Sequence, residues 1–141
     1  GGGSDLAEGG AGRDKIYGGS GADRMYGEAG SDRLFGGGGH DLVVGGAGND
    51  KLVGGGGRDR LRGDEGSDTF VYKRGFDADI IKDFQAGLDR LDLSDLAFAN
   101  EAELRAVAHH KNGNLIIRFG DGDRLKMNDS HFDQVFDDFL L

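Results

Sequence analysis

Apolar residues recur at a fixed interval of nine along the first half of the chain. Seven consecutive nonapeptides run from Gly9 to Val71, and each carries an apolar residue at its eighth position. A glycine-rich segment of the form GGxGxD occupies the first six positions, where glycine allows the backbone positive φ angles. Each repeat therefore predicts a six-residue turn followed by a three-residue strand with one inward side chain. The inward residues are Ile16, Met25, Leu34, Val43, Leu52, Leu61 and Phe70.

Strands this short are unusual in ordinary sheets, so we expect successive turns to lie on alternate edges of a flattened coil. Two repeats, or 18 residues, then complete one revolution, and the aspartate at position six of every repeat stacks on its counterpart in the next coil. One edge carries Asp5, Asp23, Asp41 and Asp59, and the other carries Asp14, Asp32, Asp50 and Asp68. Coils about 4.8 Å apart would bring these carboxylates into mutual repulsion unless a cation lies between them.

The same aspartates indicate which cation. Carboxylates and backbone carbonyls, without histidine or cysteine, form a hard-oxygen ligand set that suits calcium better than zinc. Three consecutive aspartate pairs on each edge predict up to about six sites. One apolar side chain per nine residues buries too little to hold a glycine-rich backbone, so we expect folding to require the metal. A flexible glycine-rich linker is the competing interpretation, but a linker would not keep aspartate and apolar positions in phase over seven copies.

The repeats resemble the nonapeptide block of the RTX proteins, which bacteria export by type I secretion. The resemblance implies a right-handed parallel β-roll with each calcium ion held between adjacent turns of one edge. The position-six aspartates and the carbonyls of alternate turn residues would be the ligands. The glycines at positions one and four that this implies are Gly9, Gly12, Gly18, Gly21, Gly27, Gly30, Gly36, Gly39, Gly45, Gly48, Gly54 and Gly57.

The resemblance continues after the repeats. Residues 67–72, 79–84 and 89–94 are similar to segments that close the roll in serralysin-like proteases and other RTX exports. It implies that Asp79 and Asp83 help to complete a calcium site at the C-terminal end of the roll. The alternative is that both are the polar face of an alternating strand.

The second half, residues 72–141, predicts a small capping region after the roll of residues 1–71. We expect strands at 80–81 and 91–93, a helix over 101–109 capped by Asn100 or Ser94, a hairpin from 115–119 and 124–127, and a short helix at 131–138. His109 and His110 are placed at the end of the first helix. The fold class is thus all-β, a parallel β-roll with a small antiparallel cap and one or two short helices.

The amino-acid composition limits the classes of ligand and partner that the chain can bind. The net charge is −9, with acidic residues in excess in both halves, which argues against nucleic acid and anionic membranes and suits divalent cations. No apolar stretch approaches the ~18 residues of a membrane span, and no N-terminal signal peptide is recognisable. The chain starts within a repeat, so we expect a C-terminal piece of a longer secreted protein. Its last residues, 138–141, resemble the acidic-then-hydrophobic end of type I secretion signals, although an ordinary final strand is also consistent with them.

Catalysis has no support in the sequence. None of the four histidines, His40, His109, His110 and His131, belongs to an HExxH zinc motif, and no nucleophile elbow occurs. We therefore expect a monomeric calcium-binding module that folds outside the cell and carries the secretion signal of a larger protein. A second hypothesis is an accessory module for an anionic polysaccharide, and a third is adhesion or assembly through calcium. The residues of the polysaccharide hypothesis are Lys15, Arg33 and Lys51, with Tyr17 and Phe35 beside them.

Overall fold

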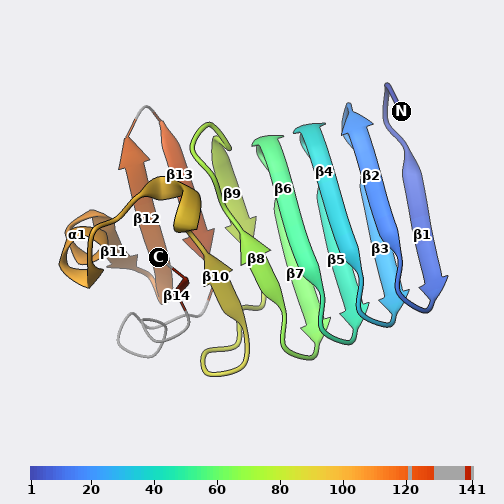
Figure 1. Ribbon diagram of the computed structural model, residues 1–141. Helices are drawn as coiled ribbons and strands as arrows, with labels where there is room; N and C mark the ends of the chain where they lie inside the picture. Colours follow the sequence, from blue (N-terminus) through green and yellow to red (C-terminus); the bar gives the residue numbers. More distant parts are fainter. Residues whose placement is uncertain (121, 129–138, 141) are drawn as a thin grey trace.

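The computed structural model describes residues 1–120, 122–128 and 139–140, and it shows a flattened coil of two sheets (Figure 1). The eight-stranded sheet has the order β1-β3-β5-β7-β9-β13-β12-β11, and the six-stranded sheet has the order β14-β10-β8-β6-β4-β2. Odd-numbered and even-numbered strands of the repeats thus alternate between the sheets, and each pairs in parallel with the strand 18 residues away. The roll strands are β1 (Leu6–Ala11), β2 (Lys15–Ser20), β3 (Arg24–Ala29), β4 (Arg33–Gly39), β5 (Leu42–Ala47), β6 (Lys51–Gly57), β7 (Arg60–Glu65) and β8 (Thr69–Val71). The parallel β-roll predicted from the nonapeptides is confirmed.

The strands are longer than predicted. Strands β1 to β7 contain six or seven residues rather than three, because the ladder continues into the glycines that open each turn. Gly37 and Gly38 of β4, for example, pair with Gly55 and Gly56 of β6. The expectation of a six-residue turn was wrong for this reason: the second and third turn positions stay in register with the neighbouring coil even where they carry a side chain, as Ser20 and Ala29 do.

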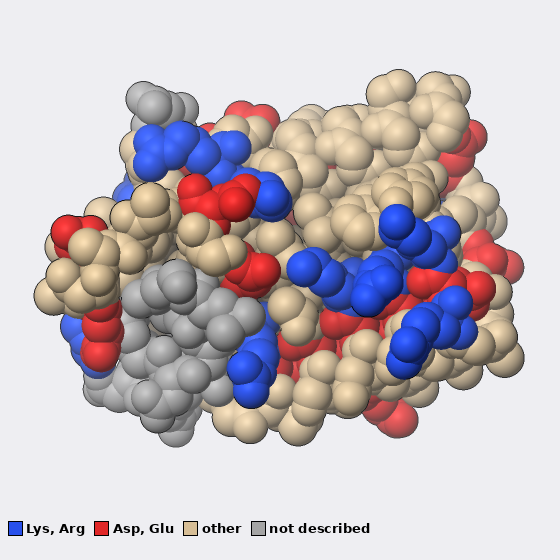
Figure 2. Space-filling view, viewed as in Figure 1, with Lys and Arg blue, Asp and Glu red and all other residues tan. Residues whose placement is uncertain are grey.

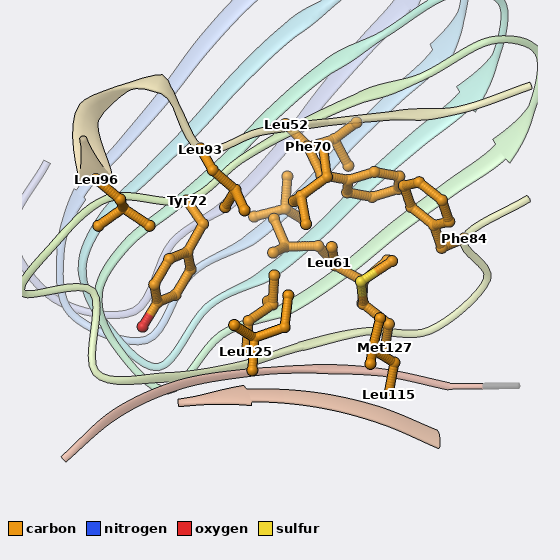
Figure 3. Packing of buried hydrophobic residues seen from close by; sticks show 14 of the residues in the cluster. Leu52, Leu61, Phe70, Tyr72, Phe84, Leu93, Leu96, Leu115, Leu125 and Met127 are labelled. Carbon is orange, nitrogen blue, oxygen red and sulfur yellow. The ribbon is translucent and has the colours of Figure 1, made fainter. Parts of the chain in front are cut away.

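A column of position-eight side chains fills the roll. Met25, Leu34, Val43 and Leu52 have no exposed surface, and Leu61 and Phe70 are exposed by 2% or less. The column widens at the C-terminal end, where Leu115, Leu125 and Met127 of the capping strands face Leu61 and Phe70 (Figure 3). The single apolar residue of each repeat thus becomes part of one continuous core only because coils stack.

The cap extends the roll instead of standing apart from it. Strands β9 (Ala78–Ile81) and β10 (Arg90–Asp92) add one further strand to each sheet after Val71. The antiparallel strands β11 (Ala108–Lys111), β12 (Asn114–Gly120) and β13 (Asp123–Met127) then join the eight-stranded sheet through parallel pairing of β13 with β9. Strand β14 (Phe139–Leu140) pairs with β10. The division of the chain at residue 71 therefore remains a prediction from composition, since both sheets run across it.

Two short helical segments accompany the cap. The 3-10 helix η1 covers Ser94–Leu96, and α1 covers Glu101–Val107 with the Asn100 side chain accepting a hydrogen bond from the Glu103 backbone N–H. The predicted continuation of α1 through His109 was wrong, because His109 and His110 lie in β11 and pair with β12. Their backbone groups gain ladder hydrogen bonds that a frayed helix end would not provide. The predicted helix at 131–138 lies outside the described residues. Among the described residues, no helix is long and apolar enough to cross a membrane.

Candidate metal centre

Each edge of the roll carries a hydrogen-bonded stack of aspartates. The backbone N–H of one aspartate donates to Oδ1 of the aspartate 18 residues later, at 2.8 Å from Asp23 to Asp41 and from Asp41 to Asp59. The opposite edge repeats the contact, at 2.7 Å from Asp32 to Asp50 and 2.9 Å from Asp50 to Asp68. Asp5 and Asp14 begin the two stacks through the same contact to the next aspartate. The structure thus places all eight predicted aspartates on the edges expected from the 18-residue period.

The second oxygen of these carboxylates is unpartnered. Oδ2 is buried and makes no hydrogen bond in eight aspartates, namely Asp14, Asp23, Asp32, Asp41, Asp50, Asp59, Asp68 and Asp79. Buried polar atoms nearly always have partners, and a buried carboxylate oxygen without one is strongly unfavourable. A cation between successive coils would be a partner for each of these oxygen atoms. The carboxylates on both edges therefore fit a row of metal ions.

The glycine at position one leaves a hollow beside each unpartnered oxygen. A Cβ atom added to Gly18 would lie 2.5 Å from Asp23 Oδ2 and 2.5 Å from the carbonyl oxygen of Gly36 in the next coil. The φ angle of Gly18 is ordinary, so space rather than backbone strain requires glycine there. The same pair of oxygens surrounds the corresponding position at Gly9, Gly27, Gly36 and Gly45, and at Gly54 the nearest atoms belong to Asp59. Carboxylate and carbonyl oxygens that face one small hollow are the ligand type that calcium takes.

The other turn glycines have a different role. Gly30 has a φ of 135°, and a Cβ there would collide with the carbonyl of Gly12 in the preceding coil. Gly21, Gly39, Gly48 and Gly57 meet the preceding coil in the same way, whereas Gly12 has no coil before it. At position two, Glu28 and Asp64 keep left-handed φ angles of 74° and 68°. The turn geometry is therefore maintained even where the repeat lacks its second glycine.

Burial makes the charged form of the stacked carboxylates unfavourable. It raises the pKa of Asp59 to about 6 and that of Asp68 to about 7, although the backbone N–H bonds lower both values. The pKa of Asp41 and of Asp50 is raised for the same reason. A cation beside these four carboxylates would offset the cost of burying their charged form. Among the described residues, no three His, Asp or Glu side chains gather closely enough to hold a metal ion by themselves, so backbone carbonyls must supply part of any ligand shell.

Comparison with protein families identifies the repeats. Residues 1–34 and 35–70 match the RTX calcium-binding nonapeptide repeat model, which comprises four copies. Residues 1–70 belong to the RTX calcium-binding repeats. The family resemblance expected from the sequence is confirmed, and calcium is the ion that repeats of this family bind.

Solved structures with the same fold are similar along almost the whole chain. The extracellular lipase LipA from Serratia marcescens is 27% identical with a TM-score of 0.59, and the match covers 96% of this chain and 20% of the lipase. The AlgE6R3 subunit of the mannuronan C5-epimerase from Azotobacter vinelandii is 26% identical with a TM-score of 0.56, and the match covers 98% of this chain and 78% of that subunit. The RTX chain described here thus spans a fifth of the lipase. Comparison with curated proteins gives no match.

The two aspartate stacks of the RTX roll end differently. Asp79 closes one stack by accepting from the Asp59 N–H at 2.9 Å, and its Oδ2 is buried and unpartnered like the others. Burial raises the pKa of Asp79 to about 8. Asp89 closes the opposite stack by accepting from the Asp68 N–H at 3.0 Å, but its second oxygen accepts from the Gln85 N–H at 2.8 Å. Asp89 was not among the predicted site residues, although it precedes the strand Arg90–Asp92 as the repeat aspartates precede theirs.

Asp83 does not join the Asp79 stack. Its two oxygens accept hydrogen bonds from the Gly63 N–H at 3.0 Å and the Asp64 N–H at 2.9 Å. The carboxylate thus accepts from backbone donors of the last glycine-rich turn, which is followed by no further glycine-rich turn. The structure brings Asp79, but not Asp83, into the position of the repeat aspartates.

The basic stripe of the polysaccharide hypothesis lies on the outer face of the six-stranded sheet. Lys15, Arg33 and Lys51 are aligned across β2, β4 and β6, and Tyr17 stacks on Phe35 with ring centroids 4.9 Å apart. Lys15 Nζ lies 5.0 Å from the Tyr17 ring centroid, and Lys51 lies 4.0 Å from Asp92. Figure 2 shows lysine and arginine side chains beside a band of acidic residues on the face in view. Two of the three bases therefore already have partners within the chain.

Proposed function

We propose that this chain is a calcium-dependent folding module of an exported protein. The observation that carries the proposal is the row of eight buried carboxylate oxygens without partners. Fixed at the coil edges by the hydrogen bonds of the other carboxylate oxygen, they are ready to receive a cation, and they oppose folding when none is bound.

The proposed ligands are the Oδ2 atoms of the stacked aspartates and the turn carbonyls that face the same hollows. On one edge the stack from Asp5 to Asp79 provides four consecutive pairs, namely the three predicted within the repeats and the C-terminal one to which the family resemblance assigned Asp79. On the other edge the pairs run from Asp14 to Asp68, and Asp89 ends the row with both oxygens hydrogen-bonded. The chain would then hold about seven calcium ions instead of six. Calcium supplies the positive charge that keeps these carboxylates ionised in the folded state.

Calcium concentration would control the fold. Metal sites that form only in the folded state convert binding free energy into folding free energy. Extracellular calcium-binding modules typically have dissociation constants of about 10⁻⁴–10⁻³ M for calcium. A module with this affinity would bind calcium and fold outside the cell, and would stay metal-free and unfolded in a calcium-poor compartment. Each coil contributes ligands to its neighbours, so the response would be cooperative, as in other stacked-repeat proteins.

Export through the C-terminal residues is the second part of the proposal. In the extracellular lipase, the segment similar to this chain makes up a fifth of the length, which supports the module as one part of a larger secreted protein. Phe139 and Leu140 pair with Leu91 and Asp92 of β10 in the folded state, whereas Asp138 and Leu141 lie outside the described residues. A signal read during export before folding would become a strand afterwards. Any catalytic activity would reside elsewhere in that larger protein.

The decisive experiment is far-UV circular dichroism during a calcium titration from chelator to about 10 mM, a range that covers the affinities of extracellular sites. Magnesium is titrated in parallel as the control for ionic strength. A steep change from a disordered to a β-sheet spectrum with calcium alone supports the proposal. A β-sheet spectrum already present in chelator and unchanged by calcium would contradict it.

Binding of an anionic polysaccharide is a second candidate function. The aligned bases Lys15, Arg33 and Lys51 and the stacked Tyr17–Phe35 pair favour it, as does the likeness to a subunit of a mannuronan C5-epimerase. Retardation on an alginate matrix tests it, with a variant in which all three bases are replaced by alanine. Equal migration of the parent and the variant would exclude this stripe as the binding surface.

A further inference from the structure

A basic groove crosses the outer face of the eight-stranded sheet, opposite the stripe just described. It has a volume of about 900 Å³ and is lined by residues of β3, β5, β7, β9, β13, β12 and β11. These strands are successive neighbours in that sheet (Figure 1). Seven of its lining residues are arginine or lysine. This concentration is unexpected in a chain with a net charge of −9.

The positive charge is densest on the two capping strands. Arg118 of β12 lies directly opposite Arg124 of β13, and Lys126 follows on the same face of β13. Like charges directly opposite each other on neighbouring strands destabilise a sheet. Arg60 on β7 adds a further cation to the same groove across β9. The fold therefore retains a repulsive cluster at a place where the sheet itself gains nothing from it.

Among the described residues, no acidic side chain forms an ion pair with this cluster. Every ion pair of the described residues lies elsewhere, and none of them includes Arg118, Arg124 or Lys126. Acidic residues that border the groove, such as Asp59 and Asp79, are 1% exposed and turn their oxygens into the stack. In the calcium-loaded protein, a point that rests on the proposed function, their charge is neutralised by the metal. The free charge of the groove is then positive.

We propose that this groove binds a soluble ligand that carries a phosphomonoester, with Arg118 and Arg124 holding the phosphate group. A guanidinium group forms two parallel hydrogen bonds to phosphate. A phosphomonoester carries nearly two negative charges above its second pKa of ~6, and so matches two opposed arginines, whereas a carboxylate carries one. Ile80 of β9 and Ile116 of β12 flank Lys126 in register, and they offer apolar contact to the organic part of the ligand.

The test compares two sugars that differ only at C6, which carries a phosphate ester in one and is a carboxylate in the other. Binding of glucose 6-phosphate and of glucuronate is measured by NMR shift titration at pH 7.5 in saturating calcium, after circular dichroism has shown that the protein is folded. We expect glucose 6-phosphate to bind at least ~10-fold more tightly. The double variant Arg118→Gln/Arg124→Gln should lose this preference and should be no less stable than the parent, because it removes a cross-strand repulsion. A failure of calcium-induced folding would appear in the circular dichroism, independently of sugar binding.

The matched control is Arg13→Gln/Arg74→Gln, which removes the same charge from exposed positions outside the groove. It should bind glucose 6-phosphate as the parent does. Three results would overturn the proposal: equal affinity for the two sugars, equal loss in both double variants, or binding to phosphatidic acid vesicles without binding to glucose 6-phosphate. The first would indicate an acidic-sugar site, the second a diffuse electrostatic effect, and the third a membrane surface.

Discussion

The backbone N–H of Asp41 donates a 2.8 Å hydrogen bond to Oδ1 of Asp59, while Oδ2 of Asp59 is buried without a partner. One carboxylate therefore has two separable tasks. Its first oxygen joins neighbouring coils, and its second oxygen is left for a cation. Substitutions that preserve the first task and remove the second can distinguish a metal ligand from a structural residue.

Asp59→Asn is such a substitution. The asparagine oxygen can still accept from Asp41, but the second position becomes an amide that carries no charge and cannot ligate through oxygen. We expect the calcium midpoint for folding to rise several-fold. In chelator the same variant should be more stable than the parent, because a buried carboxylate with a raised pKa has been removed. Calcium titration by circular dichroism measures the first effect, and the β-sheet signal that remains in chelator measures the second.

Asp5→Asn is the control for that experiment. Asp5 is exposed at the open end of the stack and pairs with the N-terminal amine at 3.5 Å, so its replacement should change both quantities less. Mid-stack Asp41→Ala and Asp50→Ala should likewise weaken the calcium transition more than Asp5→Ala. Equal effects at the end and in the middle would contradict a model in which stacked neighbours share ions.

Two glycines of one strand provide a second test. In β4, a Cβ at Gly36 would meet both Asp41 Oδ2 and the Gly54 carbonyl, whereas a Cβ at Gly38 would meet nothing within 4 Å. Neither glycine has a positive φ, so strain does not differ between them. Gly36→Ala should block one hollow and raise the calcium midpoint, and Gly38→Ala should leave it nearly unchanged. Isothermal calorimetry can also show whether Gly36→Ala loses one ion; identical behaviour of the two variants would remove the hollows from the proposed sites.

The 18-residue period was sufficient to predict the roll, its core column and the aspartate edges. It could not predict strand length, because the glycines that open each turn carry no side-chain pattern yet still pair, as Gly37 does with Gly55. It also could not predict how the stacks end. Asp79 and Asp89 follow the last repeat aspartates of their stacks by 20 and 21 residues, not by 18. Only the folded chain shows that the second oxygen of Asp89 accepts a hydrogen bond from the Gln85 N–H. The placement of His109 in a strand depends on pairing with Ile116, a contact that local helix propensity does not contain.

The different ends of the stacks predict different ion counts. Asp79 has a buried unpartnered oxygen, but both oxygens of Asp89 accept backbone hydrogen bonds. Asp79→Asn should therefore reduce the number of bound calcium ions by one. Asp89→Asn should leave the number unchanged while lowering thermal stability, since one of its two acceptors is replaced by a donor that faces an N–H group. Native mass spectrometry in calcium counts the ions, and a loss of one ion in Asp89→Asn would show that the final coil of that edge also holds metal.

The raised carboxylate pKa values predict how pH affects the metal-free protein. Burial raises the pKa of Asp59, Asp68 and Asp79 from 3.8 to about 6, 7 and 8. Between pH 3.8 and the raised pKa of each aspartate, the folded state holds a proton that the unfolded state has released. The free energy of unfolding therefore decreases as pH rises through this range. The contribution is fully present below pH 3.8 and is lost as pH passes through about 6 to 8. In calcium-free buffer the chain should thus show a larger β-sheet fraction by circular dichroism at pH 5 than at pH 8.

Bound calcium should remove this pH dependence. In the calcium-loaded fold the carboxylates are ionised, as they are in the unfolded chain above pH ~4, so calcium-induced folding takes up and releases almost no protons between pH 5 and pH 8. The calcium midpoint should therefore change little over this range and rise below it, where the unfolded carboxylates gain protons. Asp79→Asn should flatten the pH dependence of the metal-free protein most at the upper end, because Asp79 has the highest of the three pKa values. Circular dichroism in chelator and calcium titrations at pH 4, 5, 6, 7 and 8 give both curves for the parent and the variant. A calcium midpoint that changes steeply between pH 8 and pH 5 would mean that the metal does not keep the buried carboxylates ionised.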